Sequence, residues 1–189
     1  MGTSLTAGYG LEDPDSAYPG LLQTRIDSLG LSYDVVNAGV SGETSAGALR
    51  RLAWTMKRPV DVFVLETGAN DGLRGLSVDS LRANVQAIID SVRRAQPRAH
   101  IVLVGMEAPP NLGARYTARF REVYPELARK NHLPLVPFLL AGVAGVDSLN
   151  QGDGIHPNMR GERIVAGNVW KVLEPLLSRW YGRGGAPAA

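Results

Sequence analysis

Four short apolar segments alternate with longer stretches of helical periodicity, and this alternation limits the folds open to the chain. Each segment is rich in Val, Leu or Ile with little polar alternation, which is typical of parallel strands covered on both faces. The predicted strands are 33–37, 60–66, 100–105 and 133–136. Strands that alternate with helices predict a parallel sheet with helices on both sides.

The predicted helices have recognisable starts and stops. Ser77 and Ser80 can cap a helix over 77–95, and Pro97 follows its end. Thr44 is the expected N-cap of a helix over 44–56. The other predicted helices are 16–28, 116–131 and 161–181. Without an internal repeat or linker, we predict one domain over residues 1–181 and a flexible Gly/Ala/Pro-rich tail, 182–189.

The composition excludes several classes of function. The chain has 189 residues, 44% of them apolar, and no cysteine, which rules out disulfides, thiol nucleophiles and thiolate metal sites. The net charge is only +2, and the basic residues are scattered along the sequence rather than clustered. We therefore expect no nucleic-acid partner. No apolar run approaches the roughly 18–20 residues of a membrane span, and the first ten residues are not a signal peptide. We expect a soluble protein, with cytoplasmic location and export after removal of a leader both left open.

Four polar loops fall at or near the carboxyl ends of predicted strands, where functional groups of open parallel sheets collect. These loops are residues 2–5, 37–42, 68–71 and 153–157. A strand normally precedes the first such loop, yet here the chain begins at Met1. Either the start is truncated, or another chain or segment fills that position.

Ser4, His156 and Asp153 are the candidate catalytic residues. A serine hydroxyl needs an adjacent base to act as a nucleophile. His156 lies in a polar loop, whereas His100 opens an apolar strand and His132 closes a helix, so we expect structural roles for the latter two. Asp153 precedes His156 by one turn, and its carboxylate could fix the imidazole tautomer and stabilise the imidazolium.

An ester hydrolase also needs donors for the oxyanion. The backbone N–H groups of Ser4 and Gly39 and the side-chain amide of Asn70 are the candidates. Each residue alone has another interpretation. The serine could be a helix cap or turn residue, the glycine a turn, and the asparagine a cap after a strand. The Asp–His pair could be a surface turn or half a metal site, although no second histidine lies near in the sequence. Their ordered occurrence along one chain favours the catalytic interpretation.

This ordered set resembles the SGNH (GDSL-type) hydrolases, whose conserved serine, glycine, asparagine and histidine match Ser4, Gly39, Asn70 and His156. Asp153 matches the family's aspartate. The segments that are similar to the bacterial thioesterase/arylesterase/lysophospholipase branch are 5–11, 65–75, 124–128 and 153–158.

The resemblance implies a flavodoxin-like three-layer α/β/α sandwich with a parallel sheet, whose first strand is missing from this chain. Strand donation by a second chain would fill that position and form a homo-oligomer. The family usually has aspartate where this chain has Thr3, whose hydroxyl keeps a hydrogen-bonding group, so we expect the activity to be tuned rather than lost.

The implied activity is a serine esterase with an acyl-enzyme intermediate and no metal or organic cofactor. Its substrates would be small-molecule aryl or short-to-medium acyl esters, with thioesters and lysolipids as further candidates. Apolar residues in two loops could contact the acyl chain, namely Leu73, Leu76, Pro109, Pro110 and Leu112. Two alternatives remain open: a carbohydrate O-deacetylase on the same scaffold, and a catalytically degraded scaffold that binds acyl ligands.

Overall fold

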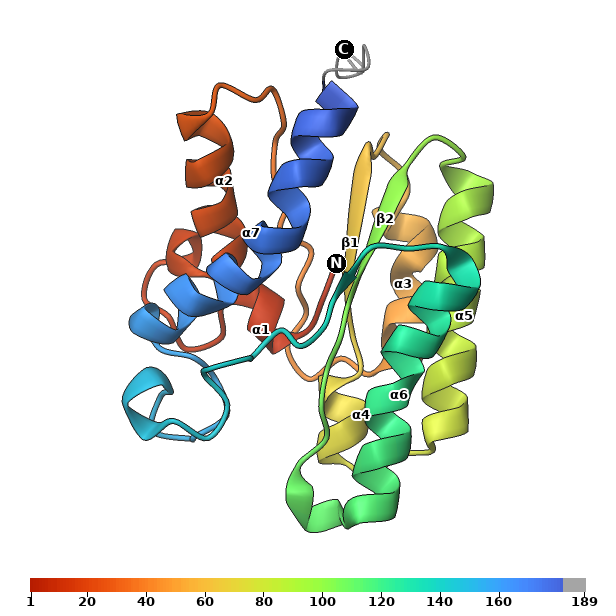
Figure 1. Ribbon diagram of the computed structural model, residues 1–189, viewed down its shortest axis with the longest axis vertical. Coiled ribbons are helices and arrows are strands. Elements are labelled where there is room, and N and C mark those ends of the chain that lie inside the picture. The colour runs from red at the N-terminus through yellow and green to blue at the C-terminus, as the bar shows by residue number, and fades with distance from the viewer. Residues whose placement is uncertain (182–189) are drawn as a thin grey trace. The chain divides into compact units, whose positions relative to one another are not determined.

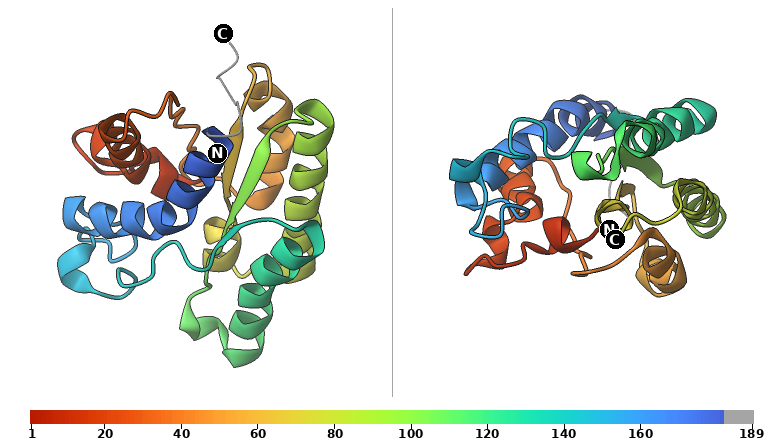
Figure 2. Two further views of the ribbon diagram at one scale, coloured as in Figure 1. Left: turned by 45° about the horizontal axis from the view of Figure 1, so that its top comes forward. Right: turned by 90° about the horizontal axis from the view of Figure 1, so that it is seen from below.

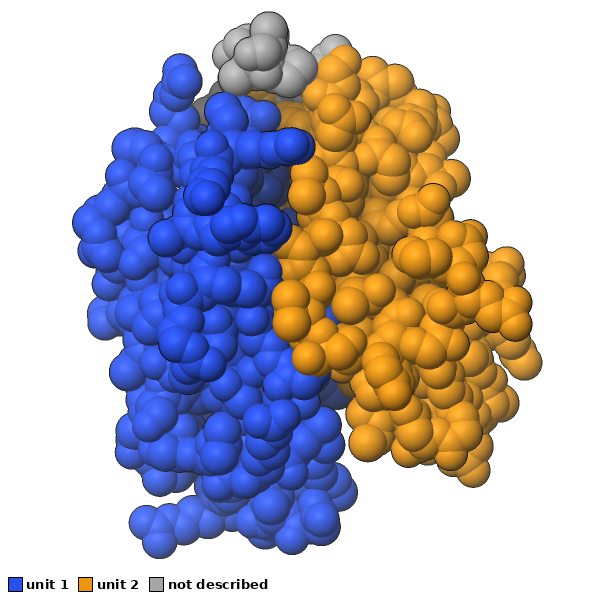
Figure 3. Space-filling view, turned by 180° about the vertical axis from the view of Figure 1, so that it is seen from behind, with its two compact units in different colours: residues 1–3, 42–138 blue, residues 4–41, 139–189 orange. Residues whose placement is uncertain are grey.

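The computed structural model describes residues 1–181, so the predicted tail, 182–189, lies outside the described residues. The chain divides into two compact units, which Figure 3 colours separately. Unit 1 comprises Met1–Thr3 and Gly42–Phe138, and unit 2 comprises Ser4–Ser41 and the described residues from Leu139 onward. That the chain is a single domain stays a prediction.

Unit 1 contains a parallel sheet of three strands, in the order β1-β2-β3. The strands are β1 (Val62–Glu66), β2 (His100–Val104) and β3 (Leu135–Val136). Val62 lies opposite His100, and Leu103 lies opposite Leu135. Figures 1 and 2 show β1 and β2 side by side. The central strand is buried from its second residue to its end, as its unbroken apolar run predicts. Three predicted strands are therefore confirmed, with shorter bounds.

The fourth predicted strand, 33–37, is wrong. These residues form no strand, and a side chain satisfies part of their backbone. The Gln23 amide donates to the carbonyl of Tyr33 (3.0 Å) and accepts from the N–H of Val35 (2.6 Å). One glutamine thus offers the donor and acceptor that a neighbouring strand would supply, and Val36 is 74% exposed rather than buried.

The first residues of the chain lie alongside β1. The Met1 amino group donates to the carbonyl of Val64 (2.9 Å), and the N–H of Glu66 donates to the carbonyl of Met1 (3.0 Å). Met1 therefore makes backbone bonds to an edge of β1 that would otherwise lack them. Strand donation from a second chain stays a prediction.

The helices of unit 1 pack against one another and against the sheet. They are α3 (Ser45–Thr55), α4 (Ala69–Leu73), α5 (Val78–Ala95), the short η2 (Pro110–Leu112) and α6 (Ala114–Asn131). α5 packs against α3 and α6, and α6 packs against β2 and β3 (Figure 1). The predicted caps Thr44 and Ser77 are confirmed, since Thr44 accepts from the N–H of Gly47 and Ser77 accepts from the N–H of Ser80, each at 3.3 Å. Ser80, also predicted as a cap, lies inside α5 instead.

Unit 2 is helical among its described residues, and α2 packs against α7. Its elements are α1 (Ser4–Ala7), η1 (Pro14–Ser16), α2 (Tyr18–Ser28), η3 (Asp147–Leu149) and α7 (Met159–Tyr181). The buried carboxylate of Glu162 on α7 accepts from the N–H of Tyr18 (2.8 Å). Since Ala17, the N-cap of α2, makes no side-chain capping bond, Glu162 supplies the acceptor for this helix start.

The predicted α/β class with a parallel sheet is confirmed. Of the helices in residues 1–181, none combines the length and the apolar character needed to cross a bilayer.

Candidate active site

Unit 2 brings Ser4, His156 and Asp153 together. Ser4 is the first residue of α1, and its Oγ lies 2.8 Å from Nε2 of His156. On the other side of the imidazole, Nδ1 lies 2.7 Å from Oδ2 of Asp153. The imidazole therefore bridges a hydroxyl and a carboxylate that are far apart in the sequence.

The turn that carries His156 is built by its own sequence. Oδ1 of Asp153 accepts from the N–H groups of Ile155 (2.9 Å) and His156 (3.0 Å), an arrangement typical of aspartate in turns. Gly154 supplies the positive φ (69°) that the turn needs. This leaves Oδ2 directed at the imidazole, so one side chain both shapes the turn and orients the histidine.

Hydrogen bonding keeps Asp153 ionised. The bond from the His156 side chain, followed by the two backbone N–H bonds, lowers the pKa of Asp153 to about 2. An ionised carboxylate only accepts, so Nδ1 of His156 must carry a hydrogen and donate it. In the neutral imidazole Nε2 is then an acceptor for the Ser4 hydroxyl. This tautomer can remove the serine proton.

Tyr9 is a residue of the site that the sequence reasoning did not single out. Its ring lies 4.7 Å from the His156 ring, centre to centre, with the planes tilted by 43°. Its N–H donates to the carbonyl of Ser4 (3.1 Å). Gly8 and Gly10 flank it, both with positive φ, and this pair of glycines is the signal that could have found the turn.

Gly39 lies against the helix that begins at Ser4. A Cβ at this position would overlap the backbone of Ala7, so glycine is the residue that fits. Asn37 connects the two segments, because its amide donates to the carbonyl of Thr6 (2.8 Å) while its oxygen accepts from the N–H of Gly39 (3.0 Å). The predicted oxyanion donor is thus engaged by Asn37 in this structure.

Asn70 lies on α4 in unit 1, where its amide donates to the carbonyl of Glu43 (3.0 Å). An amide nitrogen carries two hydrogens, and this bond uses one of them. The helix is held by the neighbouring Asp71, whose buried carboxylate accepts from the N–H (2.8 Å) and the hydroxyl (2.6 Å) of Ser45. Within unit 1, Asn70 is therefore fixed by its own bond to Glu43 and by the bonds of Asp71 to Ser45.

Thr3, where the resembling family has aspartate, is buried and bonded to Glu66. Its N–H lies 2.6 Å from one carboxylate oxygen, and its hydroxyl lies 2.9 Å from the same oxygen. The expected hydrogen-bonding role of the threonine hydroxyl is present, and Glu66 is the partner that the sequence did not indicate.

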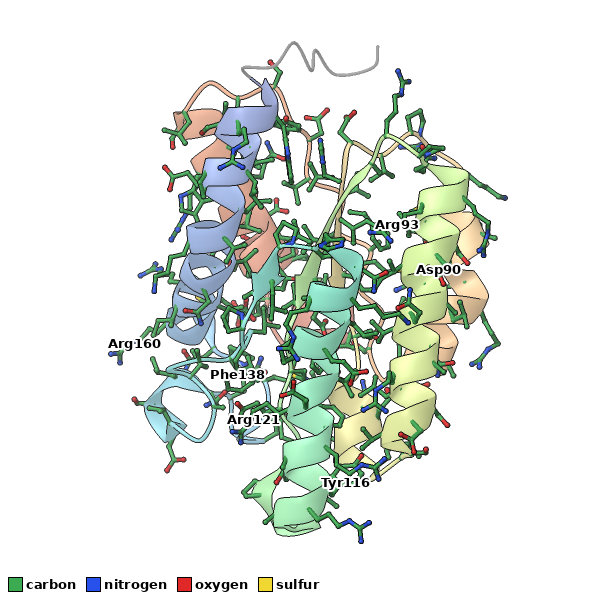
Figure 4. All side chains as sticks on the ribbon, turned by 45° about the vertical axis from the view of Figure 1, so that its right-hand side comes forward. Asp90, Arg93, Tyr116, Arg121, Phe138 and Arg160 are labelled. Atoms are coloured by element: carbon green, nitrogen blue, oxygen red, sulfur yellow. The ribbon has the colours of Figure 1, made fainter. Side chains whose placement is uncertain are left out.

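The predicted substrate contacts belong to two loops of unit 1 that lie close together. A Cβ at Gly75 would approach Leu112 to 3.6 Å, and the Tyr116 hydroxyl donates to the carbonyl of Leu76 (2.8 Å; Tyr116 is labelled in Figure 4). Leu73 and Leu76 are exposed, by 46% and 40%. Pro110 is also exposed, and Pro109 and Leu112 are half-buried, so these loops present apolar surface.

The chain is similar to known proteins over most of its length. Residues 1–164 match the GDSL-like Lipase/Acylhydrolase family. Esterase TesA of Pseudomonas aeruginosa is 41% identical, over 94% of this chain and 87% of its own. Thioesterase 1/protease 1/lysophospholipase L1 of Escherichia coli is 36% identical, over 94% of this chain and 83% of its own. A crystal structure of TesA superposes with a TM-score of 0.86 at 39% identity, over 93% of this chain and 99% of that one.

Fold and sequence together define an α/β hydrolytic enzyme of the SGNH type. The chain belongs to the GDSL-like lipase/acylhydrolase family. The predicted family, with its α/β/α fold, and the prediction of a serine ester hydrolase are confirmed.

Proposed function

We propose that this chain hydrolyses aryl and short-to-medium acyl esters through Ser4, His156 and Asp153, with an acyl-enzyme intermediate. The observation that carries the proposal is the continuous path from Ser4 Oγ through the imidazole to the Asp153 carboxylate, with contacts of 2.8 and 2.7 Å. This is the arrangement of nucleophile, base and orienting acid that ester hydrolysis by serine requires.

In the first half of the reaction, Ser4 Oγ attacks the carbonyl carbon and its proton passes to Nε2 of His156. The negative charge moves to the carbonyl oxygen, for which the N–H groups of Ser4 and Gly39 and the amide of Asn70 are the proposed donors. Because the N–H of Gly39 bonds to Asn37, it would have to share or exchange this partner when the oxyanion forms. The bond to the leaving group then breaks, and His156 returns the proton to the departing alkoxide or thiolate.

In the second half, a water molecule attacks the acyl-enzyme and gives its proton to the same Nε2. Collapse of the second tetrahedral intermediate releases the carboxylic acid and returns the proton to Ser4. Asp153 remains ionised throughout, because its pKa is about 2, and it stabilises the imidazolium that forms in each half.

The exposed apolar loops support acyl chains longer than acetyl as substrates. Leu73 and Leu76 offer aliphatic surface that a polar sugar would not use. Relatives named thioesterase and lysophospholipase support acyl thioesters and lysolipids as further substrates. For all of these the partner is a small acyl ester rather than a nucleic acid.

Hydrolysis of p-nitrophenyl esters from acetate to palmitate, by the parent chain and by Ser4→Ala, tests the proposal. We expect the variant to lose turnover on every ester and the parent to favour chains longer than acetate. An optimum at acetate would favour the deacetylase alternative instead. A fully active Ser4→Ala variant would remove Ser4 from the mechanism.

A further inference from the structure

We propose that Gln151 is a positioning residue that holds the His156 imidazole within hydrogen-bonding distance of Ser4 Oγ. This inference rests on the function proposed above. Gln151 lies in the loop between η3 and α7, before the turn that carries His156. Its backbone N–H donates to the carbonyl of His156 at 2.7 Å. The glutamine backbone therefore bonds directly to the residue that carries the imidazole.

The side chain of Gln151 extends this connection to the nucleophile. Its Nε2 donates to the carbonyl of Pro157 (3.0 Å) and to the carbonyl of Tyr9 (2.7 Å). Tyr9 in turn bonds to Ser4, because its N–H donates to the Ser4 carbonyl at 3.1 Å. One amide group thus joins the segment that follows Ser4 to the segment that follows His156.

The space around the amide is shaped to receive it. Gly10 has a φ of 76°, and a Cβ there would overlap Oε1 of Gln151, so the glutamine side chain packs against bare backbone. The Tyr9 ring, on the same turn, rests on the His156 imidazole at 4.7 Å. The catalytic pair is consequently held twice, directly by the bond between Ser4 and His156 and indirectly through Gln151 and Tyr9.

Loss of the indirect connection should affect the rate more than substrate affinity. The hydrogen bonds of Gln151 go to backbone carbonyls and not to the reacting side-chain atoms. Its removal should therefore leave the chemistry intact but make the distance between Oγ and Nε2 more variable. A misplacement of about 1 Å in a reacting pair can cost ~10²-fold in rate. For Gln151→Met, which keeps the length of the side chain and removes both donor bonds, we expect kcat to fall about tenfold to a hundredfold and KM to stay within about twofold.

A second variant tests the same bonds in another way. Gln151→Glu has nearly the same shape but directs an acceptor at the carbonyls of Tyr9 and Pro157, so its kcat should fall at least as far. In both variants the ¹⁵N signal of His156 Nε2, which reports the bond to Ser4, should move toward that of an imidazole without this partner. A residue that only stabilises the fold would leave this signal unchanged.

Unit 1 offers a matched control. Gln96 is also half-buried, and its Nε2 also joins two backbone carbonyls, those of Met56 (3.2 Å) and Arg58 (3.1 Å). Gln96→Met therefore removes equivalent bonds outside the catalytic residues. We expect it to keep the kcat of the parent, with a thermal midpoint lowered about as much as in Gln151→Met.

The outcomes separate this inference from the proposed function. If Ser4→Ala is inactive while Gln151→Met and Gln151→Glu keep the kcat and the ¹⁵N signal of the parent, the positioning role is refuted and the esterase proposal stands. If Gln96→Met loses kcat as much as Gln151→Met, the effect is general destabilisation and the inference also fails. An active Ser4→Ala refutes the function itself.

Discussion

Replacing Glu162 with glutamine should change how the stability of this protein depends on pH. Glu162 lies on α7 with 2% of its surface exposed, and it accepts the N–H of Tyr18 at 2.8 Å. Burial raises its pKa from 4.5 to about 7, and the bond from Tyr18 only partly opposes this rise. At 1.36 kcal/mol per pKa unit, this difference corresponds to about 3 kcal/mol.

The sign follows from which state holds the proton. Below about pH 4.5 the carboxyl is protonated in both the folded and the unfolded chain, so it contributes no dependence on pH. Between pH 4.5 and about 7 the folded chain keeps a proton that the unfolded chain loses, and the free energy of unfolding therefore falls as pH rises. Above pH 7 both states are ionised and the loss is complete.

Urea unfolding of the parent and of Glu162→Gln from pH 4.5 to pH 8 measures this contribution. Over that range the parent should lose about 3 kcal/mol more than the variant, which has no titrating group at this position. Glu174→Gln, at an exposed position on the same helix, should follow the parent. Parallel curves for the parent and Glu162→Gln would refute the assignment of a buried, protonated carboxyl.

Two further substitutions test the candidate site, and a pair of glycine substitutions tests the stability of the fold. Asp153→Asn should lower kcat by about 10²-fold or more. The same carboxylate should also stabilise the folded chain. Because the pKa of Asp153 is about 2, this stabilisation should be complete above about pH 4 and lost as pH falls toward 2, which acid unfolding of the parent and the variant would show. Asn70→Ala should cost ~2.7–4 kcal/mol of barrier in kcat if its amide binds the oxyanion, and an unchanged kcat would exclude that role. Gly68→Ala, with a φ of 101° and a Cβ that would overlap the Tyr124 hydroxyl, should destabilise by about 2–3 kcal/mol in urea unfolding, whereas Gly30→Ala, with a φ of 65° and open space, should cost about 1 kcal/mol.

The catalytic candidates could be predicted because their signals are local. Asp153 and His156 are separated by only one turn of the chain. Ser4 could be assigned to the same site because its loop is one of four polar loops predicted at the carboxyl ends of strands. The strands 60–66, 100–105 and 133–136 could be predicted for a similar reason, since each is an apolar run that a parallel sheet buries.

What could not be predicted depends on bonds between side chains and distant backbone. The segment 33–37 has the composition of a strand, but the amide of Gln23 bonds to its backbone. No pattern in the sequence predicts such a bond. The bonds of the Gln151 amide to the carbonyl of Tyr9 and of the Glu66 carboxylate to the N–H of Thr3 are of the same kind. They depend on the folded path of the chain, so they emerge only from the structure.

The central claim is that Ser4 is a nucleophile activated by His156, and covalent labelling tests it most directly. An ethyl fluorophosphonate should react with the parent chain, because attack by Ser4 Oγ forms a P–O bond, expels fluoride and passes the proton to His156. Peptide mapping by mass spectrometry should place the adduct on the peptide that contains Ser4, and Ser4→Ala should remain unlabelled. An adduct on another serine, or ester hydrolysis that continues in a chain fully labelled on Ser4, would contradict the account.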